Sequence, residues 1–366
     1  MRQLDCTASG DEVCQNGMEQ EPKASGDSRL KLLKTLPGLA ISAFFLWWTY
    51  VRVGPNGKRG FDAAAFHQLH VVAPLWIAGV LFFSIAGYGT RCYRAYAMLR
   101  SVGARFSACA RIFMTSLAAN NILPLRIGDV MRIFTYAGDV NTTPSVILST
   151  VILEKLLDVF SLGVMFTITT QFGLGVSPHL RTVAEIGMLI STLGLLAMVF
   201  GAKALQAPLQ RFFDQATNPT VKKLEHFLML ALGCISDIGI VGTLLLIVYS
   251  IIAWACEGMI YVSLAKAVGL TSDRIGPWQA AAEANLSFLI PSSPGGIGPF
   301  ELACKDALVR HGASPAESGL FGLVMHLYLI LAITGVGGAW FLAHRLHRAR
   351  RAPLGVELNT LPAKLP

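Results

Sequence analysis

The chain has 366 residues, of which 53% are hydrophobic and 14% are charged, and its formal net charge is +8. A soluble domain usually carries about 25% charged residues, so this composition argues against a soluble enzyme or a disordered protein and indicates a polytopic membrane protein. The seven cysteines include no C-x-x-C pair, which gives no sign of a metal site or a disulfide framework, and we expect neither a metal nor a cofactor.

The amino-terminal region combines a polar tail with a first apolar segment. Residues 1–30 are polar and aperiodic, which predicts a disordered tail rather than a signal peptide. The first apolar segment, at about 32–53, has basic residues before it and Trp47, Trp48 and Tyr50 near its end. Basic residues favour the cytoplasmic side of a membrane and aromatic residues its surfaces, so we expect a cytoplasmic amino terminus.

Five further segments are long and apolar enough to cross a membrane as helices. Arg91, Arg94 and Arg111 follow the second span and are expected in a cytoplasmic segment. A basic tail at 347–366 follows the last span, so six crossings return both termini to the cytoplasm. An apolar run at 227–265 leaves open whether it contains one span or two. The five segments lie at about 71–88, 145–172, 183–205, 238–264 and 318–343.

Two other apolar helices are too short to cross a membrane, and helix breakers interrupt both. The first, at about 107–134, contains Pro124 to Gly128 (PLRIG), and the second, at about 278–310, contains Pro294 to Gly298 (PGGIG). Both breaks share the pattern P-x-x-I-G, and the topology places them at opposite faces. We predict two inverted re-entrant hairpins whose breaks meet at a substrate site near the midplane. The alternative is two polar loops.

Ionisable residues inside the predicted spans require an explanation, because each costs roughly 2.5–3.5 kcal/mol at the centre of a membrane helix. Glu154 and Asp158 lie four residues apart on one helical face, and Arg126 and Arg132 are their candidate partners. Glu257 lies in the fifth span. These charges predict a polar path for a charged group; the alternative is that they are structural ion pairs that hold the hairpins against the spans.

The second hairpin carries a glycine-rich break and a further charge pair. Gly295 and Gly296 could offer backbone N–H groups to a phosphate, or they could allow close helix packing, and the sequence leaves both open. Glu301 and Lys305 lie four residues apart and can pair with each other. No catalytic motif is present, so no catalytic residue is assigned. The candidate substrate-binding residues are Asn121, Arg126, Asp129, Arg132, Glu154, Asp158, Glu257, Gly295, Gly296 and Glu301.

Four motifs occur in an order that resembles the membrane region of the lysyl-phosphatidylglycerol synthase family (the multiple peptide resistance factor) and its stand-alone relatives. The resemblance covers roughly residues 32–343, and it implies a lipid flippase region at 31–346 without the synthase domain. Lys155 and Asp129 stand where relatives often carry Arg and Glu, which leaves the substrate open. The motifs are N-x-x-P-x-R-x-G-D-x-x-R from Asn121, E-K-x-x-D from Glu154, W-x-x-E from Trp254 and P-x-x-P-G-G-I-G-x-x-E from Pro291.

The resulting expectation is an all-α polytopic integral protein of the bacterial inner membrane that moves a phospholipid or polyprenyl lipid with a polar or charged headgroup. Arg126 and Arg132 would hold the lipid phosphate, and the acids would meet a cationic headgroup or balance the arginines. A separately encoded lipid-modifying enzyme is a candidate partner; nucleic acid is not. The alternatives are a membrane-embedded glycosyl- or aminoacyl-transferase and a non-transporting membrane partner of a separate synthase.

Overall fold

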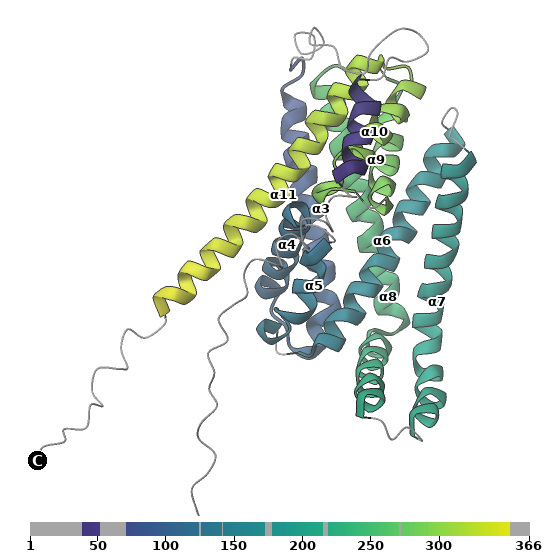
Figure 1. Ribbon diagram of the computed structural model, residues 1–366, viewed down its shortest axis with the longest axis vertical. Coiled ribbons are helices and arrows are strands. Elements are labelled where there is room, and N and C mark those ends of the chain that lie inside the picture. Colours follow the sequence, from purple (N-terminus) through teal and green to yellow (C-terminus); the bar gives the residue numbers. More distant parts are fainter. Residues whose placement is uncertain are drawn as a thin grey trace, which may run out of the picture.

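The computed structural model describes residues 39–51, 71–123, 126–140, 142–172, 178–214, 219–270, 272–290 and 292–351. Every regular element within these ranges is a helix (Figure 1), so the predicted all-α class is confirmed. The expected amino-terminal tail, Pro124, Leu125 and Pro291 of the two breaks, and most of the basic carboxyl-terminal tail lie outside the described residues.

Five long helices form the body of the molecule (Figure 1). They are α3 (Leu75–Leu99), α6 (Pro144–Phe172), α7 (Pro178–Asp214), α8 (Pro219–Ala267) and α11 (Pro315–Arg351). Three segments of the described chain have the length and apolarity of membrane spans: Leu75–Val102, Ser236–Ala267 and Pro315–His347. Helix α6 is also 29 residues long but carries Glu154, Lys155 and Asp158 within it.

A glycine breaks α8 near its middle and separates its polar start from its apolar part. Gly239 has φ 67° and ψ 178°, a conformation that is open to glycine because it lacks a Cβ atom. The part from Ser236 to Ala267 is one apolar helix long enough to cross a membrane. The long apolar run at 227–265 therefore provides a single span-length segment, Ser236–Ala267, with the break at Gly239 close to its start. This corresponds to one span rather than two.

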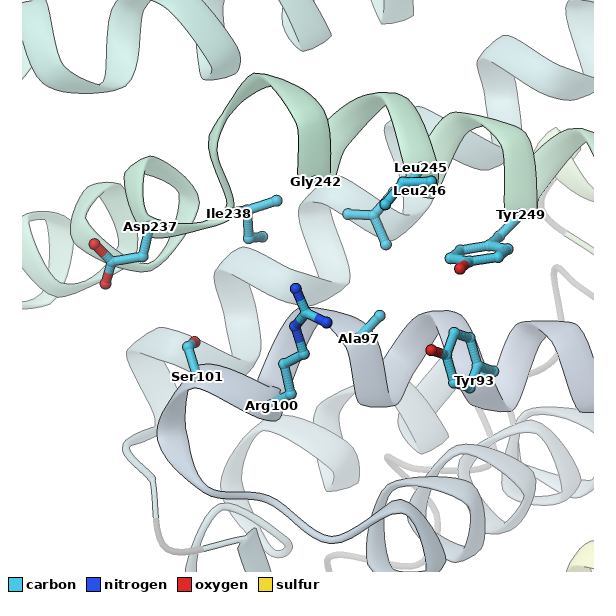
Figure 2. Close-up of a pocket in the computed structure, with 10 residues that line it drawn as sticks. All are labelled: Tyr93, Ala97, Arg100, Ser101, Asp237, Ile238, Gly242, Leu245, Leu246 and Tyr249. Atoms are coloured by element: carbon cyan, nitrogen blue, oxygen red, sulfur yellow. The ribbon is translucent and has the colours of Figure 1, made fainter.

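Figure 2 shows a small crevice beside this break, between α8 and the end of α3. Arg100, the first residue of the 3-10 turn η2 (Arg100–Val102) after α3, points across the crevice. The rings of Tyr93 and Tyr249 meet edge to face, with 5.3 Å between their centroids. The volume of the crevice is about 80 Å³, well below the roughly 300 Å³ at which small-molecule sites begin. The crevice is therefore a packing defect at the kink rather than a substrate site.

Two pairs of short helices occupy opposite halves of the molecule (Figure 1). The first pair is α4 (Phe106–Ile122) with α5 (Ile127–Phe134), and the second is α9 (Gly276–Leu286) with α10 (Pro299–Arg310). Helix α11 packs against both α4 and α10 and therefore contacts both pairs. Within each pair the two helices pack against each other.

Helix α3 continues well past the predicted end of the second span at residue 88. It runs to Leu99, and Arg91 and Arg94 on its last turns are buried rather than exposed in a cytoplasmic segment. Arg111, inside α4, is also buried and pairs with Asp139 at 2.8 Å. Carboxylates of Glu257, Asp158 and Asp139 neutralise these three arginines, which therefore belong to the packed bundle. The cytoplasmic side of this segment remains a prediction.

The helix Leu39–Val51, whose last five residues form the π-helix η1 (Trp47–Val51), packs against the second short pair. The Ser42 hydroxyl accepts a hydrogen bond from the Ser293 backbone N–H at 2.9 Å. The Lys305 ammonium donates to the Thr49 carbonyl oxygen at 2.7 Å. Residues 32–38 and 52–53 of the predicted first span lie outside the described residues.

A polar chain stabilises the outer end of the second pair. His311 joins Asp273 through Nδ1 at 2.7 Å and Gln279 through Nε2 at 2.6 Å, and Gln279 donates to Glu283, which also pairs with Arg310. Partial burial alone would raise the pKa of Asp273, but hydrogen bonds from His311 and from two backbone N–H groups hold that pKa below its ordinary value. This network fixes α9 against α10 at the end away from the break.

Candidate functional site

A cavity of about 650 Å³ lies between the two short pairs and four of the long helices. Its wall residues Tyr88, Asp158 and Ile330 lie near the midpoints of α3, α6 and α11. The volume falls in the range of roughly 300–1,000 Å³ that ligand pockets occupy. The ionisable residues in the wall are Arg91, Arg126, Glu154, Lys155, Asp158, Glu257 and His326.

The two helix breaks meet at this cavity. Asn121, at the end of α4, and Gly295, in the 3-10 turn η6 (Pro294–Gly296), both line it. A Cβ atom on Gly295 would stand 3.5 Å from the Asn121 carbonyl oxygen, so the two backbones are in contact. The Arg126 guanidinium donates to the Phe288 carbonyl oxygen at 3.0 Å, which links the segment after the first break to the second pair.

Each carboxylate in the cavity wall is paired with a buried arginine. Arg132 donates to Glu154 at 2.8 Å, and both side chains are 3% exposed. Two further pairs connect helices across the bundle: Arg94 to Asp158 at 2.7 Å and Arg91 to Glu257 at 2.9 Å. A buried charge is tolerated only when it is paired and hydrogen-bonded, which these contacts provide.

Aromatic rings in the wall hold the same arginines. The Arg91 guanidinium lies over the rings of Trp254 and Tyr88, at 5.1 and 5.3 Å from their centroids. The Arg132 guanidinium lies 5.4 Å from the ring centroid of Phe113. The Trp254 indole N–H donates to the Asp158 carboxylate at 3.3 Å. Such cation–π contacts stabilise arginine charge away from water.

Arg126 differs from the other arginines of the cavity in both backbone and charge. Its φ of 53° places it in the left-handed region, and it is the one non-glycine residue with positive φ in the described chain. Backbone of this kind is costly and gathers at functional sites. Among the described residues no carboxylate pairs with Arg126, and its side chain is exposed to the cavity. Arg126 therefore retains guanidinium donors that a ligand can use.

Residues 36–337 match the family described as the lysylphosphatidylglycerol synthase TM region, which covers most of the chain. The chain belongs to this family. The resemblance that the four motifs carry is thereby confirmed. Membership also supports a membrane protein with a lipid-related role, in line with the apolar span-length helices.

A curated relative of this family member carries an enzyme's name. Glycosyltransferase AglD of Haloferax volcanii is 22% identical, over an alignment that covers 90% of this chain and 61% of that protein. The chain thus spans less than two thirds of the length of this relative. No solved protein structure matches the chain.

In this member of the family, seven of the ten predicted substrate-binding residues line the cavity and three stand directly behind its wall. Asp129 contacts Lys155 at 3.5 Å, and Arg132 pairs with Glu154 as expected. The Glu301 carboxylate accepts from the Gly298 N–H at 2.6 Å and thus caps α10. The seven in the wall are Asn121, Arg126, Glu154, Asp158, Glu257, Gly295 and Gly296.

Two predicted charge partners are not the ones that the structure brings together. Asp158 pairs with Arg94, 64 residues before it, rather than with Arg126 or Arg132. Lys305 does not pair with Glu301: it donates to a backbone carbonyl oxygen while Glu301 contacts His326. Spacing of four residues along a helix places two side chains on one face, but a third element that packs there can take either partner.

His326 is a site residue that the sequence prediction missed. Its Nε2 atom contacts the Gly295 carbonyl oxygen at 2.8 Å, and its Nδ1 atom contacts Glu301 at 2.7 Å. A carbonyl oxygen can only accept, so Nε2 carries a hydrogen, and the second contact needs a further proton on either Nδ1 or the carboxyl group. The His326–Glu301 pair is therefore neutral overall. Its position inside a long apolar segment was the available signal.

The glycines of the second break are required by backbone geometry. Gly295, Gly296 and Gly298 all have positive φ, and a Cβ atom on Gly296 would stand 2.4 Å from the Phe288 ring. The Gly296 N–H donates to the Ser293 carbonyl oxygen, and the Gly298 N–H donates to Glu301. Because these two N–H groups are engaged, they are not available to a phosphate, which favours the packing interpretation of the glycines.

The described residues offer no obvious metal centre. Within those ranges, no three His, Cys, Asp or Glu side chains gather closely enough to hold a metal ion. The polar groups of this cavity are paired carboxylates, one arginine with spare donors, and amide and hydroxyl groups on the two breaks. These groups determine which ligands it can bind.

Proposed function

We propose that this chain is a lipid translocase that moves a lipid with a polar or charged headgroup between the leaflets of the membrane. The observation that carries the proposal is the charged cavity enclosed by two broken helix pairs at the midpoints of span-length helices. Broken helices that meet near the midplane form the substrate sites of many transporters. Irregular backbone at that depth is tolerated where it lines a polar cavity.

In this proposal the headgroup enters the cavity while the acyl chains remain in the bilayer. Leu289 and Ile290 belong to the cavity wall and are exposed, at 58% and 39%. Apolar side chains at the lip allow acyl chains to pass, whereas the charged interior provides the contacts that replace water around the headgroup. Arg126 is assigned to the lipid phosphate, because guanidinium groups bind phosphate through several N–H donors.

The proposed topology has six crossings and two re-entrant pairs in the bacterial inner membrane, with both termini in the cytoplasm. The opposite placement of the α4–α5 and α9–α10 pairs in Figure 1 supports inverted entry. In that arrangement Leu39–Val51, α3, α6, α7, the second part of α8 and α11 are the spans.

The translocase proposal is tested in proteoliposomes with a leaflet-resolved lipid assay. The full chain should accelerate lipid movement over protein-free vesicles, and Arg126→Asn should slow that movement at least about tenfold, the loss of roughly 1.4 kcal/mol or more of binding to the moving state. Asn suits the positive φ at this position, so the variant removes charge without adding strain.

A matched control is Arg181→Asn, because Arg181 is an exposed arginine on α7 whose side chain contacts Glu185 at 3.6 Å. Its rate should equal that of the unmodified chain. If the purified chain moves no lipid faster than empty vesicles do, or if Arg126→Asn and Arg181→Asn behave alike, the assignment of this cavity to lipid transfer is wrong.

A second candidate function is glycosyl transfer, because the relative named above is called a glycosyltransferase. That function predicts product formation by the purified chain when it is given a sugar donor and a lipid acceptor. It also requires a carboxylate that is free to act as a base. Since Glu154, Asp158 and Glu257 are each engaged by an arginine, the translocase is the stronger proposal.

A further inference from the structure

Each acid of the cavity already has an arginine as its counter-charge, which disfavours the binding of a cationic headgroup. Glu154, Asp158 and Glu257 each accept a charge-assisted hydrogen bond of 2.7–2.9 Å from a buried arginine. Drawing one of them to an ammonium group would leave a buried arginine without its counter-charge, which is strongly unfavourable. The expectation that these acids meet a cationic headgroup is therefore not favoured by the geometry.

Three of the aromatic rings in the cavity wall already lie beside a protein cation. The Arg91 guanidinium lies over the rings of Trp254 and Tyr88, and the Arg132 guanidinium lies over the ring of Phe113. An aromatic cage for a quaternary or primary ammonium needs open ring faces close together. In the described wall of this cavity, the rings nearest the acids already pack against protein cations.

The remaining charges leave a single positive excess. Lys155 contacts Asp129 at 3.5 Å, and His326 with Glu301 is neutral as a pair. Among the described residues around the cavity, Arg126 is the cation without a carboxylate partner. Because one unmatched positive charge is balanced by one negative charge, the cavity suits a group that carries one charge, as a phosphodiester does.

Neutral hydrogen-bonding groups line the same cavity as Arg126. The Asn121 amide nitrogen donates to Thr334 at 3.2 Å, and the Asn285 amide nitrogen donates to the Ala281 carbonyl oxygen at 2.8 Å. Both amide oxygens remain as acceptors in residues that line the cavity, and Ser292 lines it as well. Amide oxygens and hydroxyl groups bind the hydroxyl groups of a polyol or a sugar.

We propose that the substrate is an anionic lipid with a single phosphodiester whose headgroup beyond the phosphate is uncharged and carries hydroxyl groups. This inference rests on the proposed translocase function and narrows it: Arg126 holds the phosphodiester, and the neutral groups of the two breaks hold the hydroxyl groups. An aminoacylated lipid with an added ammonium group would be a poor substrate, because each acid already has an arginine counter-charge and the cavity carries one unmatched positive charge.

The test compares lipids that share acyl chains and differ in the headgroup and its charge. The full chain is reconstituted with phosphatidylglycerol, lysyl-phosphatidylglycerol, phosphatidylethanolamine or phosphatidic acid as the traced lipid. Phosphatidylglycerol should move at least about tenfold faster than the two lipids that carry an ammonium group, a difference of about 1.4 kcal/mol. Phosphatidic acid, a phosphomonoester with more negative charge, should also move more slowly than phosphatidylglycerol.

Substitutions at one position link the preference to Arg126. Arg126→Lys keeps the charge and should keep the preference for phosphatidylglycerol, whereas Arg126→Asn should abolish it even where residual movement continues. Arg181→Asn, on the exposed face of α7, should retain both rate and preference.

The outcomes separate the two proposals. If none of the four lipids moves with the unmodified chain, the translocase function itself fails. If lipids move but those with an ammonium group move as fast as phosphatidylglycerol or faster, the function stands and the charge inference is overturned. A preference for phosphatidylglycerol that persists in Arg126→Asn would overturn the role of Arg126.

Discussion

The ion pair between Arg132 and Glu154 holds α5 against α6 directly behind the cavity wall. Both side chains are 3% exposed, and their atoms approach to 2.8 Å. Glu154→Gln removes the negative charge and leaves Arg132 buried without a counter-charge. Breaking a buried pair in this way costs about 3–5 kcal/mol. We expect a loss of that size in the free energy of unfolding, measured by denaturant titration in detergent.

Two comparisons make the Glu154 prediction specific. Glu185→Gln breaks the exposed Arg181–Glu185 contact on α7 and should change stability by less than about 1 kcal/mol. The double substitution Arg132→Met with Glu154→Leu replaces both charges by apolar groups and should lose less than Glu154→Gln alone. A single variant as stable as the exposed control would show that Arg132 finds another partner.

At the residue scale the sequence identifies charged residues more reliably than it identifies their partners. Glu154, Asp158 and Glu257 were recognised because a carboxylate inside an apolar helix is rare and needs a reason. Arg94, the partner of Asp158, follows an apolar run, and a basic residue there normally marks the membrane surface. Only the packing of α3 against α6 and α8 shows that this stretch is buried.

The close approach of α5 to α4 depends on a glycine. A Cβ atom on Gly128 would stand 2.0 Å from the Ser116 carbonyl oxygen of α4. Gly128→Ala should therefore force α5 away from α4 and destabilise the protein by about 1–3 kcal/mol, the usual range for overpacking. Because Arg126 immediately precedes α5, lipid movement in proteoliposomes should fall as well.

Gly89 provides the matched control at the same scale. It lies inside α3, and a Cβ atom there would meet nothing within 4 Å. Gly89→Ala should leave stability unchanged or raise it by up to about 1 kcal/mol, because alanine favours helix more than glycine does. If Gly128→Ala were as stable as Gly89→Ala, the α4–α5 contact would be looser than the structure indicates.

At the element scale the breaks were predictable and the helix lengths were not. Pro and Gly within short apolar segments mark helix interruptions, which placed the two breaks correctly relative to α4 and α10. The end of α3 was missed because Arg91 and Arg94 resemble a polar boundary. The positive φ values of Gly295 and Gly298 give the physical reason for a pattern that was visible only as repeated glycine.

On the scale of the whole molecule, the arrangement of the two short pairs connects the charged residues to the proposed function. Each pair brings one break to the cavity, and together they enclose it between long helices. No local feature of either pair forms this site alone. The two breaks could be predicted from Pro and Gly in short apolar segments, but the contact of Arg126 with Phe288 depends on tertiary packing.

The proposed inverted arrangement predicts which side of the membrane the outer end of each helix pair occupies. Ser101, just after α3, and Arg274, just before α9, are both exposed. Along the chain Ser101 lies next to the α4–α5 pair and Arg274 next to the α9–α10 pair, and the two pairs occupy opposite halves of the molecule (Figure 1). A cysteine at position 101 should react with a membrane-impermeant maleimide only from the cytoplasmic side, and a cysteine at position 274 only from the other side. Accessibility in intact cells and in inverted vesicles measures this.

Cys92, Cys109 and Cys304 are buried, whereas Cys256 is partly exposed, so the background reaction of the native cysteines has to be measured. Each variant is compared with the unmodified chain under the same labelling, so any background reaction is subtracted. Reaction of both introduced cysteines from one side would mean that the two pairs enter from the same face. With the pairs in opposite halves of the molecule, the breaks could then meet only if one pair crossed the bilayer completely. In that case, alternating access through inverted repeats would no longer explain how a headgroup passes between leaflets.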